Sequence, residues 1–244
     1  MFFIGALVSL TCLFIAYYIF QTSIGLFTSL FVTIAMTPFM LNLVRYEEDR
    51  DEQLDYVERI NFAQRHRDIL KVYSAFFVGM TLCLALVFIA LPQSTTQNIF
   101  KDQIAQINAI RANVAFADTF QKILVNNIGV LSLSFLFSFL FGAGAVFILA
   151  WNASVLAAAI GMAAQQIGGL KGLPFAILVF FPHGSLEILA YFIAGIAGGL
   201  VSTVVLRRHT NKFWFVVKDS VQLMVIAGVL LVAAAFIESM SITL

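Results

Sequence analysis

The sequence predicts an all-α fold, a polytopic bundle of transmembrane helices, and three observations lead to this class. Of the 244 residues, 61% are hydrophobic and only 11% are charged, and the mean hydropathy is +0.96. Apolar runs of about 18 residues or more, long enough to cross the hydrocarbon core as a helix, recur along the chain. These runs do not alternate between apolar and polar residues, as the strands of a membrane barrel do. We expect about seven spans, plus a re-entrant or broken helix before Pro182.

The charge and the cysteine content argue against a nucleic-acid-binding protein, a disulfide-linked protein and a cysteine metal cluster. The formal net charge is +1, and no concentrated basic face is present, so we expect no nucleic-acid partner. Cys12 and Cys83 lie in apolar runs with no second ligand nearby, so they predict neither a disulfide framework nor a metal cluster. The first residues lack a basic region and a small-residue cleavage pattern, which favours a retained membrane helix over a cleaved signal peptide.

The first part of the chain divides into a hairpin and a charged segment. Residues 2–20 and 24–43 are apolar runs separated by Gln-Thr-Ser, so residues 1–44 predict an N-terminal transmembrane hairpin. Residues 45–71 carry eight acidic and six basic side chains, with apolar residues at helical spacing. They predict a charged cytoplasmic helix, which is either a connector or a docking surface for a soluble partner.

The remaining residues, 72–244, predict the membrane core. A third span covers residues 72–91 and is closed by Pro92. Residues 93–122 have apolar side chains every three or four positions. They predict an extramembrane amphipathic helix that either lies along the membrane interface or covers a cavity. A fourth span is expected over residues 126–152.

Glycine content and length set the expected limits of the next helices. Gly142 and Gly144 lie in the fourth span and allow a close helix crossing or a local break. Residues 153–166 form either a short fifth span or a segment that does not cross fully, and the count of seven spans takes the first alternative. The apolar run at residues 173–181 reaches only about 14 Å as a helix, against a hydrocarbon core of roughly 30 Å. It therefore predicts a re-entrant or broken helix beside a cavity.

Two further spans complete the predicted topology. Residues 185–206 and 221–237 are apolar, and Glu238 follows the second of them. Basic residues between these spans place that connection on the same side as the charged segment. We therefore expect a multi-pass protein of the cytoplasmic (inner) membrane, with its N-terminus cytoplasmic and its C-terminus outside. Small residues at helix-packing spacing mark the sixth span: Ala190, Ala194, Gly195, Gly198 and Gly199.

One ionisable pair lies where hydrocarbon is expected. Between Leu124 and Leu206 the only formally charged side chains are Lys171 and Glu187, and His183 lies one helical turn before Glu187. An intramembrane carboxylate costs about 3 kcal/mol or more unless it is neutral, paired or hydrated. The pair is therefore either a proton relay or ion site in a cavity, or a structural pair that satisfies itself or caps a broken helix. A structural zinc centre needs more protein ligands than these two, so we expect no metal and no cofactor.

The residues around this pair form a recognisable pattern. The chain reads Pro182-His183-Gly184, then Glu187, Ala190, Ile193-Ala194-Gly195 and Gly198, with upstream Asn126-Asn127, Phe141-Gly142-Ala143-Gly144 and Asn152. This pattern resembles the signature of the stage II sporulation protein M family over roughly residues 72–237, although Ala153 stands where the family has glycine. The resemblance implies a membrane scaffold with an intramembrane polar motif, here Pro182, His183, Gly184, Glu187, Asn126 and Asn127. Residues 1–71 look like an addition to the family core.

Three functions are compared. The leading hypothesis is a non-enzymatic membrane scaffold of the cell envelope, which self-associates into a homo-oligomer and recruits other envelope proteins through its small-residue seams and charged helix. The alternative is a transporter or channel with a polar site at His183 and Glu187. An intramembrane hydrolase is disfavoured, because Ser185 lacks a Gly-x-Ser-x-Gly context and points away from His183 on a helix.

Overall fold

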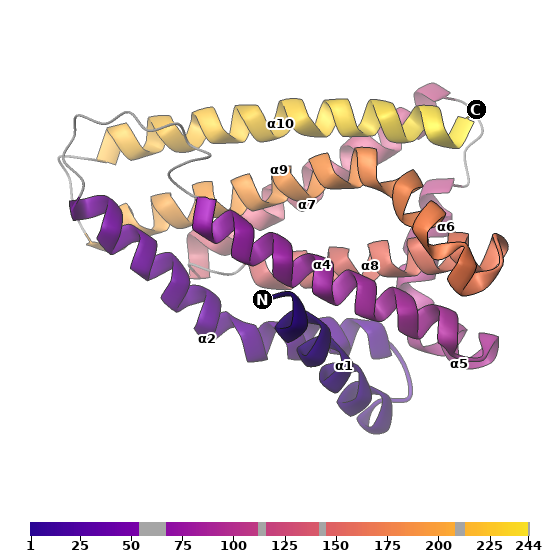
Figure 1. The fold of residues 1–244 in the computed structure, drawn as a ribbon. Coiled ribbons are helices and arrows are strands. Elements are labelled where there is room, and N and C mark those ends of the chain that lie inside the picture. The colour runs from indigo at the N-terminus through magenta and orange to yellow at the C-terminus, as the bar shows by residue number, and fades with distance from the viewer. Residues whose placement is uncertain (54–66, 112–115, 142–144, 208–212, 244) are drawn as a thin grey trace.

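The structure, a computed structural model, describes residues 1–244 except 54–66, 112–115, 142–144, 208–212 and 244. Within this part of the chain every regular element is a helix (Figure 1). In chain order the elements are α1 (Phe2–Ile19), α2 (Ile24–Gln53), α4 (Arg67–Ala90), α5 (Gln93–Ile99), α6 (Lys101–Arg111), α7 (Phe116–Phe141), α8 (Ala145–Gln166), the 3-10 turn η1 (Gly169–Lys171), α9 (Leu173–Arg207) and α10 (Phe213–Thr243).

The predicted fold class is confirmed. Seven of the described helices, namely α1, α2, α4, α7, α8, α9 and α10, are long and apolar enough to cross a membrane. Their outward faces carry large exposed apolar side chains, such as Val221, Val225 and Val229 along α10. Such a surface suits a chain that is solvated by lipid rather than by water.

The expected boundary between the fourth and fifth spans was wrong. The fourth span ends with α7 at Phe141, and α8 begins at Ala145 instead of residue 153. The predicted packing residues Gly142 and Gly144 lie outside the described residues. With 22 residues, α8 is about 33 Å long, which is enough to cross the hydrocarbon core.

The limits of the extramembrane helix also differ from the expectation. The segment 93–122 contains α5 and α6, but its last residues belong to the first turns of α7. The helical spacing of apolar residues there runs on into the following apolar run without a break, so the two form one helix. Sequence periodicity alone therefore placed the start of this span too late.

The run before Pro182 is not a separate broken helix. It forms the first part of α9, a single helix of 35 residues with Pro182 inside it. Proline removes one backbone hydrogen bond and crowds the preceding turn, so it can bend a helix without ending it. Figure 1 shows the N-terminal part of α9 turning away from the direction of the rest.

The charged segment 45–71 is only partly described. Its first residues continue α2 as far as Gln53, about ten residues past the end of the apolar span at Leu43. Its last residues form the start of α4. Residues 54–66 lie outside the described residues, so the expected continuous helix remains a prediction there.

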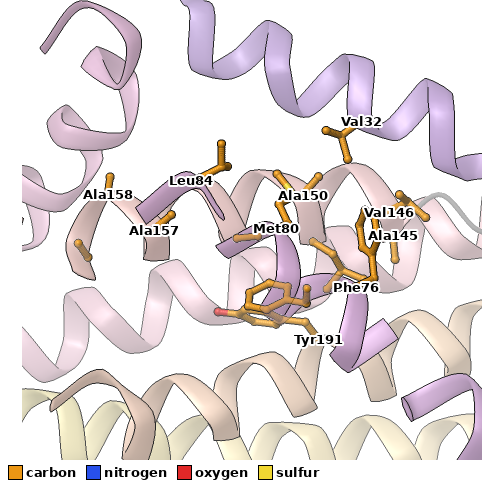
Figure 2. Packing of buried hydrophobic residues seen from close by; sticks show 14 of the residues in the cluster. Val32, Phe76, Met80, Leu84, Ala145, Val146, Ala150, Ala157, Ala158 and Tyr191 are labelled. Carbon is orange, nitrogen blue, oxygen red and sulfur yellow. The ribbon is translucent and has the colours of Figure 1, made fainter. Parts of the chain in front are cut away.

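The centre of the bundle is α8. Of its span, 67% is buried inside the protein, against 28% to 44% for the other six. On one side α8 packs against α4 and α2, and on the other against α9 and α7. Figure 2 shows the resulting core, in which Met80 of α4, Ala150 of α8 and Tyr191 of α9 lie close together.

Glycines allow the closest helix crossings. A Cβ atom at Gly5 of α1 would collide with the backbone carbonyl of Phe76, and one at Gly79 of α4 would collide with the carbonyl of Phe2. The N-terminal hairpin is therefore attached to the core by backbone-to-backbone contact between α1 and α4. The sequence analysis did not identify this pair, because neither glycine lies in a small-residue stripe.

The two ends of the bundle differ. Figure 1 shows the end of α2, the end of α9 and the start of α10 at one end, and α5, α6 and the C-terminus at the other. The described parts of both basic segments thus lie at the same end of the molecule, as the positive-inside rule requires.

Candidate functional site

The carboxyl group of Glu187 is held by an amide chain from α7. The Asn127 side chain donates from Nδ2 to Glu187 Oε1 at 2.6 Å. Asn126 donates from its own Nδ2 to Asn127 Oδ1 at 3.1 Å. Because Asn127 is buried, this arrangement fixes the orientation of Glu187. The structure therefore brings together three residues that the sequence analysis selected from two distant segments.

A second carboxyl group reaches the same point from α10. The Glu238 side chain is in hydrogen-bonding contact with Glu187, so the two acids face each other across the seam between α9 and α10. The sequence analysis placed Glu238 only at the end of the last span. The one available indication was that no other charged residue follows Asp219 in the chain.

His183 does not pair with Glu187. Among the described residues no hydrogen bond joins the two side chains, and the buried Nδ1 atom of His183 has no partner. The imidazole ring packs edge-on against Phe180, with ring centroids 5.7 Å apart. The self-satisfied pair, one of the two alternatives from the sequence, is therefore not what the structure contains.

These groups line a cavity of about 100 Å³. A water molecule needs roughly 10–15 Å³ of such space, so several fit. Side chains from α4, α6, α7, α8, α9 and α10 surround it. The polar lining residues are Gln106, Asn126, Asn127, Asn152, His183, Glu187, Tyr191 and Glu238.

The amphipathic helix α6 covers this cavity. Gln106, Ile107 and Ile110 of α6 are among its lining residues. Trp151 of α8 donates from Nε1 to Gln106 Oε1 at 3.0 Å, and the fully buried Gln103 donates from Nε2 to Ser154 Oγ at 3.0 Å. Of the two positions that the sequence left open for this segment, the structure therefore shows the one over a cavity.

The other members of the predicted motif have different surroundings. Gly184 lines the cavity, whereas Pro182 is exposed on the outside of α9. The hydroxyl group of Ser185 donates to the carbonyl of Pro182 at 3.5 Å. This bond turns the hydroxyl back along its own helix.

The small residues of α9 face the protein itself. Ala190 and Ala194 are fully buried, and Gly199 is buried as well. A Cβ atom at Gly198 would collide with the backbone carbonyl of Phe135 in α7, and one at Gly195 would lie 3.1 Å from the Cβ atom of Ala145 in α8. This stripe is therefore used for packing within one chain.

The described residues contain no cluster of three or more His, Cys, Asp or Glu side chains positioned to hold a metal ion. The site is instead an uncharged amide and aromatic lining around two acids and one imidazole. Such a lining can bind water, protons or small polar species, and it offers no arranged nucleophile.

The comparisons with known proteins give one match. The family model described as stage II sporulation protein M matches residues 72–241. No curated protein and no solved structure is a significant match. The matched region contains every residue that lines the cavity and excludes the N-terminal hairpin. Its seven long apolar helices make the chain a multi-pass membrane protein, and the match shows that it belongs to the stage II sporulation protein M family.

Proposed function

We propose that this protein is a non-enzymatic membrane carrier or channel, and that the cavity between α6 and the acids of α9 and α10 is its translocation site. The observation that carries the proposal is the convergence of Glu187, Glu238 and His183 on one space inside the bundle. Ionisable groups at membrane depth are costly, and they mark substrate or ion pathways when they line a cavity. The bend in α9 beside this space is typical of helices that form such sites.

The scaffold hypothesis, first on the sequence alone, now has less support. It relied on small-residue seams that would bind other membrane proteins or a second copy. The stripe at Ala194 and Gly198 packs against α7 and α8 of the same chain instead. A scaffold also has no need for acids around an internal cavity.

One observation still favours scaffolding as a second function. The charged part of α2 continues past its span to Gln53, a projection of about 15 Å at the usual helical rise. A projecting charged helix suits a soluble partner or a neighbouring envelope protein. Under this second proposal the protein self-associates in the cytoplasmic membrane and binds such partners at residues 45–71.

The carrier proposal is tested by flux into vesicles. The purified protein is reconstituted into liposomes, and entry of protons, Na⁺, K⁺, chloride and glycerol is followed with enclosed dyes and by vesicle swelling. We expect flux of at least one species, reduced at least about tenfold by Glu187→Gln, which keeps the shape and removes the acid.

Asp118→Asn is the matched control, since it removes an exposed acid in the first turn of α7 that does not line the cavity. Its flux should equal that of the unmodified protein. Absence of flux for every probe, from protein that remains folded in the vesicles, would overturn the carrier proposal and return the scaffold to first place.

A further inference from the structure

One polar group in the wall of the cavity has no partner. His183 is only 4% exposed, it lines the cavity, and its Nδ1 atom makes no hydrogen bond to any of the described residues. A buried polar atom without a partner destabilises the protein. This cost disappears when water or a polar ligand in the cavity contacts the nitrogen. His183 therefore indicates that the cavity is built to hold a ligand.

Several other polar groups of the wall already have partners within the chain. Glu187 accepts a hydrogen bond from Asn127 and is in contact with Glu238. Asn152 donates from Nδ2 to the backbone carbonyl of Ile148 at 2.7 Å. These contacts hold the acid and the amides in place. The imidazole of His183 is therefore the group at which a ligand gains most.

The chemistry of an imidazole nitrogen favours a hydroxyl group as its partner. Such a nitrogen donates a hydrogen bond when it carries a proton, and accepts one when it does not. A hydroxyl group suits both forms, because the same oxygen atom donates and accepts. No Lys or Arg is among the described residues that line the cavity, and a net charge is costly at membrane depth. These points favour an uncharged compound with hydroxyl groups.

Gly184 leaves the space that such a compound needs. This residue is buried, yet the only described atom near its Cβ position from outside its own helix turn is Leu156 Cδ1, 3.9 Å away. Both residues line the cavity, so the Cβ position of Gly184 faces open space instead of packed protein. The volume of about 100 Å³ holds several waters, and a short polyol fits in their place.

We propose that the cavity takes small uncharged compounds with hydroxyl groups, of about the size of glycerol. His183 is the hydrogen-bonding contact, and Gly184 sets the upper limit of size. The apolar side chains of the wall, among them Phe77 and Ile123, suit the carbon chain of a polyol. This inference rests on the carrier function proposed above and names the substrate class of that same site.

Binding is tested by NMR in detergent, without any membrane. The intact protein, labelled with ¹⁵N-histidine, is titrated with glycerol. The chain has three histidines, and His66 and His209 lie outside the described residues. A variant that combines His66→Gln with His209→Gln identifies the signals of His183. We expect glycerol to change the chemical shift of His183 Nδ1 until the site is saturated. Sorbitol, a longer polyol, and NaCl should leave it unchanged.

A substitution at Gly184 tests the limit of size. Gly184→Val fills part of the cavity and keeps every polar side chain of its wall, so the change at His183 and the entry of glycerol into vesicles should both be lost. Gly228→Val is the matched control, since its Cβ position is also open and it does not line this cavity. Should Gly184→Val fail to fold, Gly184→Ala should still raise the glycerol concentration needed for half-saturation.

The possible results separate the two proposals. No change at His183 with glycerol, or the same change with sorbitol or in Gly184→Val, overturns the inference. Water has the same hydroxyl chemistry, so vesicle shrinkage in sucrose is measured as well; entry of water or ions without glycerol also overturns it. Glycerol flux that is equal in Gly184→Val and the unmodified protein leaves the carrier and removes this site. A change at His183 without flux of any probe keeps the site and removes the carrier.

Discussion

At the scale of single residues, the site depends on contacts between side chains that are distant in the sequence. Glu187 was predicted as a site residue because it is one of only two charges in a long apolar region. Asn127 was selected through the family resemblance, and Glu238 was not selected as a site residue; neither was predicted as a contact of Glu187. Asn127 lies 60 positions earlier, and Glu238 comes from the last helix, so only the folded bundle brings them together.

The histidine shows the limit of local spacing. Positions 183 and 187 lie on one face of a helix, which made a His183–Glu187 pair plausible. In the bundle each side chain has a better neighbour than the other. Glu187 bonds to Asn127 and contacts Glu238, while His183 packs against Phe180. Their position on one helix face therefore predicted correctly that both side chains line one cavity, but the direct contact between them was predicted wrongly.

Glycine substitutions test whether the small residues of α9 serve packing within the chain. Gly198→Ala should lower the free energy of unfolding by about 1–3 kcal/mol, because its Cβ atom meets the backbone of Phe135, which cannot move as a flexible side chain would. Gly228→Ala in α10 is the matched control, since nothing lies near its Cβ position. It should be neutral or slightly stabilising, by up to about 1 kcal/mol.

The measurement is unfolding in mixed micelles as the fraction of SDS increases. If both alanine variants unfold at the same SDS fraction as the unmodified protein, then α7 and α9 do not approach as closely as the structure indicates.

At the scale of helices, the existence of the membrane-spanning helices was predictable from the sequence, whereas the residues at which they begin and end were not. Hydropathy alone gives seven spans, because each must supply about 20 apolar residues. Of the three wrong limits, those around residues 142 and 182 fall at glycine and proline, and the third is the start of α7 at Phe116. The effect of a glycine or a proline on a helix depends on how the neighbouring helices pack against it. The same residues can therefore give a break, a bend or a close helix crossing.

The attachment of α6 to α8 predicts how firmly the cavity is covered. Trp151→Phe keeps the ring and removes the Nε1–H donor to Gln106. The loss of one such hydrogen bond costs about 1 kcal/mol, which should speed local opening of α6 roughly fivefold. Hydrogen–deuterium exchange of residues 101–111 measures this opening.

Trp214→Phe provides the comparison, since Trp214 is exposed at the start of α10, at the opposite end of the bundle. It should leave exchange in α6 unchanged. Equal exchange of α6 in both variants would show that the Trp151 bond does not hold this helix in place.

At the scale of the whole molecule, the orientation of the protein in the membrane determines which half of the bilayer contains the cavity. Glu238 lies close to the end of α10, and the covering helix α6 lies at the end of the bundle opposite the basic segments. The positive-inside rule therefore predicts that the cavity lies in the outer half of the membrane.

Cysteine labelling tests this orientation. In a background of Cys12→Ala and Cys83→Ala, we introduce either Gln93→Cys or Trp214→Cys, both at exposed positions. On intact cells, a membrane-impermeant maleimide should label position 93 and spare position 214 until the membrane is permeabilised. The reverse pattern would invert the topology and place the cavity on the cytoplasmic side.

The glycine contact between α1 and α4 has a consequence for how the protein is made. Gly5 and Gly79 are 74 positions apart, and a ribosome adds about 5–20 residues per second. The first helix therefore spends about 4–15 s in the membrane before its partner is synthesised. During that interval the hairpin has to be stable in lipid on its own, since the surface that later receives it does not yet exist. Its high hydropathy, 2.2 over the span of α1, meets this requirement for independent insertion.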